Sequence, residues 1–543
     1  MGPLPRSVEI LACGLLLGLL TALMCAPHVG GGGSYYDDWG VLALGRFPPP
    51  GGLLHGLWLD YGQRPGQVLY YAALREAFGL DVSSRLALAA GMLLASSVCL
   101  YALLRRLGLA ARDALAIAGL FLAFPLSDSV WLWGIMSLTS LAIAEALLGL
   151  ILALRALEST GARALALHGV SLALYVASVL SYEVFAVAGC LAGLLYVRAV
   201  GFRRARGRWA LDVLTIAATL LLARAVLPID VATPSRMQSP AGMAGHLAQI
   251  LEGGARVAGA GVLPVGGLSP WLGVGLIAAV LLLAAFLRGG EGNPAELGHW
   301  LGIAGAGALV AVAAWAVYVP APDHYSPAAL GTVNRVNAAA GIGIAILVYS
   351  CLVLLARILA GLLRLPASAA ALGASVAALV LCGTYVVRST ADARAWDAAA
   401  ADQRGLLAAL HAALPRPPGT AVLYVFGTPR TVGPGVPVLN TTLDLTSALR
   451  IFYSGPGLQG VPVAGAGSLG CGPRGPLAGG VGGAYGESYL IDVRAPRAVL
   501  LADRAGCLAE GGLGLASGRT SSRDMAPTAA PARKATADRV ARG

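Results

Sequence analysis

Two adjacent carboxylates, Asp37 and Asp38, follow the first apolar segment of the chain, in the sequence SYYDDW at positions 34–39. Ionised side chains are costly near lipid, so acids at the edge of a membrane segment suggest a chemical role. A carboxylate can accept the proton of an attacking hydroxyl, and two together can hold a divalent cation. Adjacency alone does not choose between the two acids, although we favour Asp38 as the base. The alternative is a solvated turn or a helix cap, because aspartate is common in both.

The composition is that of a polytopic membrane protein. Of 543 residues, 57% are hydrophobic and only 12% are charged, and the mean hydropathy is +0.74. Soluble domains carry about twice as many charged residues. The formal charge of +11 comes mostly from arginines in short loops between apolar segments, where they mark membrane orientation. We therefore exclude nucleic acid as a partner.

Eleven segments are candidate membrane spans, given that about 20 apolar residues cross the hydrocarbon core. If the N-terminus is cytoplasmic, the inner segments hold fourteen arginines and the outer loops before the last span hold six. Positive residues accumulate on the cytoplasmic side, so we expect the N-terminus inside and the C-terminus outside. The Asp pair would then face the outside. The segments lie near residues 8–27, 83–104, 113–127, 129–154, 165–181, 183–199, 209–227, 271–287, 299–319, 337–363 and 366–387.

The expected fold is an α-helical transmembrane domain over residues 1–390. Its first outer loop, 28–82, is long and contains two segments, Leu53–Tyr61 and Val68–Phe78, that are expected to lie as amphipathic helices on the membrane surface. A second outer region, about 228–270, is rich in Gly and Pro.

A small α/β domain outside the membrane is expected over residues 391–512, followed by a disordered tail over 513–543. The domain would open with a helix ending at Leu414, before a proline cluster, and contain strands at 421–426 and 498–502. Gly and Pro between the strands favour loops over a large core. The tail is rich in Ala, Ser, Thr, Pro and Arg.

Two of the eight cysteines, Cys471 and Cys507, lie outside the apolar segments. In an oxidising compartment they would form a disulfide. Closing a loop of about 35 residues would stabilise a glycine-rich domain by roughly 3 kcal/mol in the chain-entropy description.

Tandem acids after the first span, a long first outer loop, many spans and a C-terminal outer domain resemble the GT-C superfamily of membrane glycosyltransferases. The resemblance covers roughly residues 1–390. It implies a polyprenyl-phosphate-linked sugar as donor, an envelope glycan, lipid or protein as acceptor, and one of the two acids as the base. It rests on YYDDW at 35–39, QRP at 63–65 with LYY at 69–71, the segment 80–109, SYE at 181–183 and NR at 334–335.

A departing polyprenyl phosphate needs a cation that stays charged near lipid, and the planar fork of arginine suits phosphate oxygens. Arg64 shares the first loop with the acids, Arg335 lies at the outer end of a span, and Arg224 lies in the outer half of another. Each is a candidate ligand of the donor phosphate. The alternative is that they anchor the protein by reaching the phosphates of membrane lipids.

Four further residues are candidate contacts for the acceptor or the sugar. Tyr36 could stack on a sugar ring or belong to the aromatic belt of the interface. Glu183 could be a second acid or the ion-pair partner of an arginine such as Arg224. His324 could orient an acceptor by hydrogen bonds or be merely exposed. Asn334 is included through the resemblance.

Two other functions compete with the enzyme. A transporter or flippase of envelope lipids would also be helical and apolar, but such proteins usually place polar features near the bilayer midplane and show repeated halves. Here the polar residues lie in predicted outer loops, and no repeat is evident. A non-catalytic envelope assembly protein would tolerate replacement of both aspartates.

Overall fold

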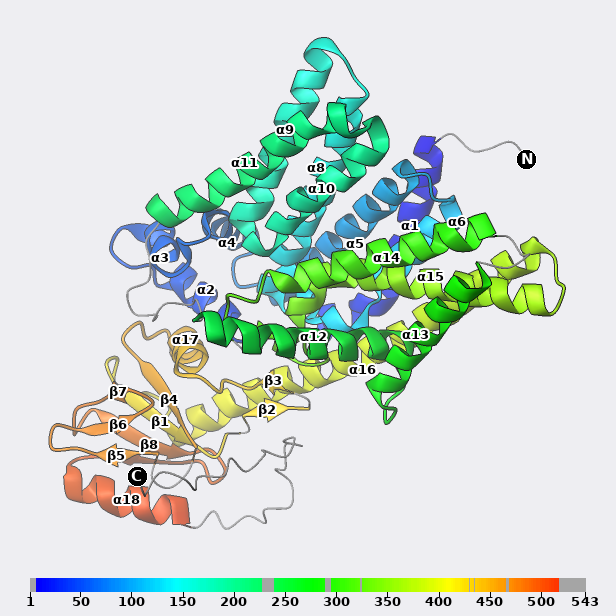
Figure 1. Ribbon diagram of the computed structural model, residues 1–543. Coiled ribbons are helices and arrows are strands. Elements are labelled where there is room, and N and C mark those ends of the chain that lie inside the picture. Colours follow the sequence, from blue (N-terminus) through cyan, green and yellow to red (C-terminus); the bar gives the residue numbers. More distant parts are fainter. Residues whose placement is uncertain are drawn as a thin grey trace, which may run out of the picture.

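The computed structural model describes residues 6–226, 239–288, 294–322, 325–428, 430–433, 435–464 and 468–516 (Figure 1). Long helices form one body, and a smaller domain with β-strands is attached to it next to the C-terminus. In this part of the chain, nine helical segments are long and apolar enough to cross a membrane. The architecture is therefore compatible with a multi-pass membrane protein.

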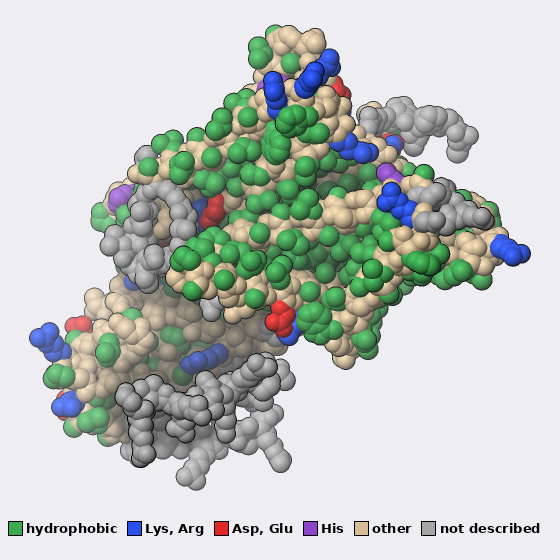
Figure 2. Space-filling model, viewed as in Figure 1, with side chains coloured by type: hydrophobic (Ala, Val, Ile, Leu, Met, Phe, Trp, Pro, Cys, Tyr) green, Lys and Arg blue, Asp and Glu red, His purple; other side chains and the backbone are tan. Residues whose placement is uncertain are grey.

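Apolar side chains cover most of the visible face of the helical body, whereas charged side chains lie near its margins and on the C-terminal domain (Figure 2). Neighbouring helices in the chain often pack together, such as α8 with α9 and α14 with α15, while α5 contacts both α1 and α8. The long helices are α1 (Arg6–Gly31), α5 (Val82–Arg106), α8 (Ser137–Leu157), α9 (Gly161–Ser181), α10 (Ala186–Val200), α11 (Phe202–Val226), α12 (Pro240–Val262), α13 (Pro270–Leu287), α14 (Pro294–Ala316), α15 (Ala338–Leu362) and α16 (Ala367–Ala413).

Three short helices connect α1 to α5: α2 (Asp37–Arg46), α3 (Gly52–Tyr61) and α4 (Pro65–Phe78). The helices expected at 53–61 and 68–78 are α3 and α4. Pro65 occupies the first turn of α4, where its missing N–H costs nothing. The sequence prediction missed α2, which begins at the Asp pair itself.

The predicted span at 113–127 is not a full span. Its helix, α6 (Ala111–Leu122), has 12 residues and is about 18 Å long, well short of the roughly 30 Å hydrocarbon core. Short helical turns follow in place of a continuous helix, because Pro125 begins a new turn. They are η1 (Pro125–Ser127), α7 (Ser129–Leu132) and η2 (Gly134–Met136), and a similar turn, η5 (Thr332–Asn337), precedes α15.

The helix that contains the predicted span at 209–227, α11, is not among the nine apolar segments. Its first half carries a buried ion pair between Arg208 and Asp212, with 2.8 Å between Nη2 and Oδ1. The Gly- and Pro-rich region before α13 holds an unpredicted helix, α12. Gly259 of α12 and Gly273 of α13 meet so closely that a Cβ on either would lie 2.0 Å from backbone oxygen. Glycine there allows contact between the two backbones, so it serves packing and not a loop.

The predicted last span and the predicted outer helix form one continuous helix, α16, of 47 residues. The expected domain boundary at residue 390 therefore falls inside a helix. No proline or glycine pair interrupts the sequence between 384 and 404, so the helix continues out of the apolar segment.

The C-terminal domain has a four-stranded sheet in the order β4-β1-β8-β9. The expected strands at 421–426 and 498–502 correspond to β1 and β9, and the parallel neighbours of β1 were missed because each has only five residues and β4 contains Gly and Pro. The strands are β1 (Val422–Phe426), β2 (Thr431–Val432), β3 (Val436–Pro437), β4 (Gln459–Val463), β5 (Gly470–Cys471), β6 (Pro476–Ala478), β7 (Val481–Gly482), β8 (Ser488–Asp492) and β9 (Arg497–Leu500).

Two helices complete this domain, α17 (Thr442–Tyr453) and α18 (Arg504–Ala516). The predicted disulfide is present and joins Cys471 of β5 to Cys507 of α18, with their Cα atoms 5.9 Å apart. Helix α17 packs against α2, so the domain lies directly beside the Asp pair. Residues 513–516 of the expected disordered tail belong to α18, and the rest of the tail lies outside the described residues.

Candidate active site

Asp38 is a buried anchor of the loop between α1 and α2. Its side chain is 4% exposed, and both oxygens accept backbone hydrogen bonds, Oδ2 from Tyr35 N (3.1 Å) and Oδ1 from Ile135 N (2.9 Å). Burial raises the pKa of its carboxyl to about 7, although these bonds and the charge of Arg85 oppose the rise. Asp38 thus joins α2 to η2, and its oxygens are already occupied.

Asp37 is the freer of the two acids. It is the first residue of α2 and is only partly buried, and no hydrogen bond or ion pair reaches its side chain from the described residues. Burial raises the pKa of its carboxyl, and the charge of Arg335 opposes the rise. Asp37, and not Asp38, is therefore the acid whose oxygens are free to bind a ligand or accept a proton.

Arg335 comes from η5, far along the chain, lies near enough to Asp37 for its charge to act on that carboxyl, and is surrounded by aromatic rings. Its guanidinium lies 5.5 Å from the ring centre of Trp133 and 5.6 Å from that of Tyr325. Its Nη1 donates to the Thr332 carbonyl (2.6 Å), and in the described part of the chain no carboxylate forms a salt bridge with it. The aromatic rings hold the cation while most of its donors stay available for an anion.

Tyr36 connects this group to the C-terminal domain. It is partly exposed, and its ring meets that of Trp133 edge to face, with 6.0 Å between the ring centres. Burial, and then the charges of Asp37 and of Asp444 in α17, raise the pKa of its hydroxyl. Its backbone has φ 46°, an uncommon conformation for a residue with a side chain. Such strain at the start of α2 is held by the bonds around it and is frequent at functional sites.

Arg64 and Glu183 form a two-pronged ion pair, with both Nε···Oε2 and Nη2···Oε1 at 2.5 Å. Burial lowers the pKa of Arg64, but the Glu183 carboxylate outweighs it and leaves the pKa above its usual value. Arg64 also lies 5.0 Å from the ring centre of Tyr182. Glu183 is therefore a partner of Arg64, and this arginine is already neutralised where a phosphate ligand was expected. The suggested pairing of Glu183 with Arg224 involves a side chain outside the described ones.

The first loop is docked tightly at this pair. A Cβ added to Gly66 would lie 2.6–2.8 Å from atoms of Ser181, at the end of α9. Only glycine allows that approach, and it places Arg64 beside the turn that carries Glu183. The ion pair consequently joins the first loop to the junction of α9 and α10.

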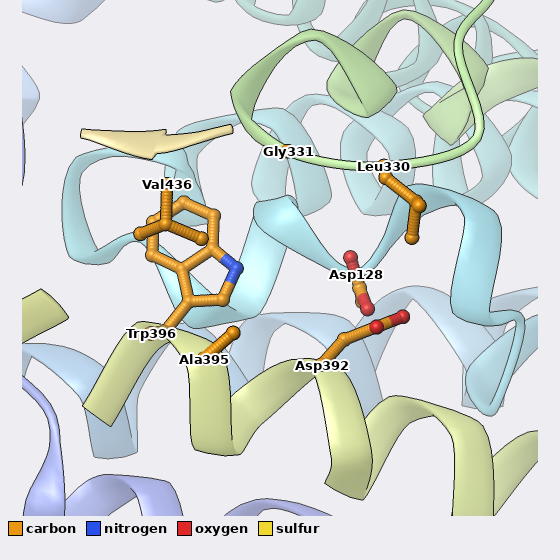
Figure 3. Close-up of a pocket in the computed structure, with 7 residues that line it drawn as sticks. All are labelled: Asp128, Leu330, Gly331, Asp392, Ala395, Trp396 and Val436. Carbon is orange, nitrogen blue, oxygen red and sulfur yellow. The ribbon is translucent and has the colours of Figure 1, made fainter. Parts of the chain in front are cut away.

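Asn334 is fully buried and does not face a site open to a sugar. Its Nδ2 donates to Asp128 Oδ1 (2.7 Å), and its Oδ1 accepts from Ser129 N (3.2 Å). Asp128 lines a small pocket together with Asp392 of α16, and their carboxyl groups point toward one another (Figure 3). The remaining lining residues are Leu330, Gly331, Ala395, Trp396 and Val436.

Two predicted site residues are not placed. His324 lies outside the described residues, and the side chain of Arg224, near the end of α11, is not described. The described residues contain no cluster of three or more His, Cys, Asp or Glu side chains that could hold a metal. A divalent cation at Asp37 would therefore take further ligands from water or from a substrate phosphate.

Sequence reasoning missed Asp128, Asp392, Trp133 and Tyr325. One signal was available for the first, because Ser127-Asp128-Ser129 is a polar triplet between two segments predicted to be spans. An acid there is expensive in lipid and marks a break in the helix. The others required the three-dimensional arrangement.

Comparison with known proteins identifies no family: no family model matches the chain, and no curated protein matches it.

Proposed function

We propose that this protein is a membrane glycosyltransferase that moves a sugar from a polyprenyl-phosphate donor to an acceptor of the cell envelope. The observation that carries the proposal is that the charge of Arg335 acts on Asp37, while in the described residues neither side chain has a partner of opposite charge in a salt bridge. They lie far apart in sequence, and α2, which begins at Asp37, packs against α17 of the C-terminal domain. This is the combination that transfer from a lipid phosphate requires.

In this reaction, a hydroxyl oxygen of the acceptor attacks the anomeric carbon of the donor sugar. The new glycosidic bond forms as the bond from that carbon to the phosphate oxygen breaks. Asp37 accepts the hydroxyl proton, and the polyprenyl phosphate leaves with the bonding electrons. Arg335 would stabilise the growing negative charge on the phosphate.

Both groups are prepared for these roles by their surroundings. Arg335 favours the ionised form of Asp37, and burial raises the pKa of that carboxyl and so makes it a stronger base once ionised. Asp38 positions the start of α2 through its two backbone hydrogen bonds. The predicted orientation would place the site on the outer face of the plasma membrane, where envelope acceptors are found.

The packing of α17 against α2 gives the C-terminal domain a place in this proposal. An acceptor approaching Tyr36 and Asp37 would pass along the edge of that domain. We therefore infer that the acceptor is an envelope glycan, lipid or protein contacted by both parts of the chain.

The test is a transfer assay with purified protein in liposomes, a polyprenyl-phosphate sugar and envelope extract as acceptor. Asp37→Asn should abolish transfer, whereas Glu252→Gln, which changes an exposed carboxylate on α12, should not. Thermal unfolding of both variants must match that of the unaltered protein. Full transfer by a folded Asp37→Asn protein would exclude this mechanism and favour a flippase or an assembly protein.

A further inference from the structure

Asp128 and Asp392 form an acid pair that the proposed reaction does not use. Asp128 is 2% exposed, and its Oδ2 is buried without a hydrogen-bond partner in the described part of the chain. The carboxyl of Asp392 faces it across the small pocket (Figure 3). Two ionised carboxylates offer no donor to each other, so a buried arrangement of this kind is stable only with a proton or a cation between them.

The surrounding charges decide which acid holds the proton. Arg388, one turn before Asp392 on α16, lies with its Nε 3.3 Å from Asp392 Oδ2 and so favours an ionised Asp392. The other residues that line the pocket carry no charge. A proton between the acids therefore belongs on Asp128 Oδ2, from which it would be donated to Asp392.

The other oxygen of Asp128 is tied to Asn334. Its Oδ1 accepts the amide hydrogen of Asn334, whose own Oδ1 accepts from Ser129 N. Asn334 is fully buried and directly precedes Arg335 in η5. A displacement of Asp128 would therefore move Asn334, and with it the backbone of the neighbouring Arg335.

We propose that Asp128 is a positioning residue, kept protonated by Asp392, that fixes the turn bearing Arg335 against Asp37. The role given to Arg335 rests on the proposed function, whereas the shared proton does not. The pocket of the acid pair also joins three parts of the fold. Asp128 lies between η1 and α7, Asp392 lies on α16, and Val436 of β3 lines the same pocket.

The pair gives the protein a defined dependence of stability on pH. Burial and the Asp392 carboxylate raise the pKa of Asp128 well above its usual value. The folded protein then holds a proton that the unfolded chain releases, so this contribution to stability is greatest in acid. It is lost as the pH rises from the ordinary pKa of aspartate, about 4, through the raised value.

Substitution by asparagine separates the two acids. An asparagine in place of Asp128 would mimic a protonated acid, since its oxygen can accept from Asn334 and its amide can donate to Asp392. We expect full-length Asp128→Asn protein in detergent to unfold at or above the temperature of the unaltered protein at pH 8, with a weaker pH dependence. Asp392→Asn should unfold several degrees lower at every pH, because Arg388 loses its partner. Glu252→Gln is the control and should change neither property.

Infrared spectroscopy supplies an independent readout. The unaltered protein near neutral pH should show the carbonyl stretch of a protonated carboxyl, and the Asp128→Asn protein should lack it. Absence of that difference would overturn the proposal. So would a loss of stability in Asp128→Asn as large as that in Asp392→Asn, or stabilisation of the unaltered protein by Ca²⁺ that Asp128→Asn abolishes, because each means an ionised Asp128.

The positioning role is tested by kinetics. Asp128→Asn should keep the KM for the polyprenyl-phosphate donor within twofold, while Asn334→Ala should raise it about tenfold with a smaller change in kcat. An unchanged KM in a folded Asn334→Ala protein would overturn the positioning role. If no variant or parent protein transfers sugar, the proposed function fails, while the unfolding and infrared results still decide whether Asp128 holds the proton.

Discussion

Asp37 and Arg335 differ from Arg64 and Glu183 in how much of their bonding capacity the fold consumes. Both arginines lie over aromatic rings in short connections between helices. Arg64 donates two hydrogen bonds to the Glu183 carboxylate, whereas Arg335 donates to one backbone carbonyl. Arg64 and Glu183 bind each other and so join parts of the fold, whereas Asp37 and Arg335 keep hydrogen-bonding groups that can bind a ligand. Residue type alone does not separate these roles.

The largest expected effect separates the two arginines by activity. Arg335→Gln should lower sugar transfer by about 10²–10³-fold, because it removes stabilisation of the developing phosphate charge. Arg64→Gln should lower it far less, and only in proportion to lost folded protein. Initial rates normalised to folded protein measure both. Equal losses in the two variants would mean that the two arginines have the same role.

The next effect separates the two aspartates by stability. Asp38→Asn should destabilise the protein by about 1–3 kcal/mol, because an amide cannot accept from both Tyr35 N and Ile135 N. Asp37→Asn should stay within about 0.5 kcal/mol, since no described group bonds to its side chain. Chemical denaturation of both variants in the same detergent gives the two values. A more stable Asp38→Asn protein would contradict its role as an anchor.

A smaller effect is expected for the ion pair itself. Arg64 and Glu183 are both partly exposed, with side-chain exposures of 28% and 42%, so solvent weakens their attraction. A double-mutant cycle of Arg64→Gln and Glu183→Gln should give a coupling of about 1 kcal/mol in unfolding free energy. The same cycle applied to Arg64 and Asp37 should give none. Coupling to Asp37 instead would merge the two groups into one site.

The smallest effect is a shift in the pH dependence of transfer. The base must be ionised, so the rate should rise with pH through the pKa of Asp37. Arg335 opposes the raised pKa of that carboxyl, so Arg335→Gln should move the acid limb to higher pH. Arg335→Lys keeps a positive charge and should leave the limb nearly in place. A profile of kcat/KM against pH measures the shift, and an unmoved limb in Arg335→Gln would place the two groups too far apart to interact.

The helical architecture and the Asp pair could be predicted because apolar segments, and charged residues next to them, are recognised from the local sequence alone. The break after α6 and the continuity of α16 were missed, although Pro125 and the lack of Pro and Gly between 384 and 404 are local signals, because hydropathy alone set the predicted ends of the spans. Asp128 is accommodated by Asn334, and α16 is held by His28 and Tyr35, which bond to Asp397 and to the Trp396 carbonyl. Hydropathy registers none of these partners.

The candidate site shows the same limit. The sequence proposes both Arg64 and Arg335 as phosphate ligands and slightly prefers Asp38 to Asp37 as the base. Which arginine meets a carboxylate depends on Gly66 docking against Ser181, and which aspartate is occupied depends on the backbone of η2. Such pairings join residues more than 90 positions apart, so spacing carries no information about them.

The unbroken helix α16 sets the rotational phase between the C-terminal domain and the bundle. At 1.5 Å per residue its 47 residues extend about 70 Å, more than twice the thickness of the hydrocarbon core. Inserting one residue into α16 between Gln403, which bonds to Trp39, and Ala413 would turn the following part of the helix by about 100° and advance it by 1.5 Å. The number of residues in this one helix therefore fixes the angle at which the C-terminal domain faces Asp37.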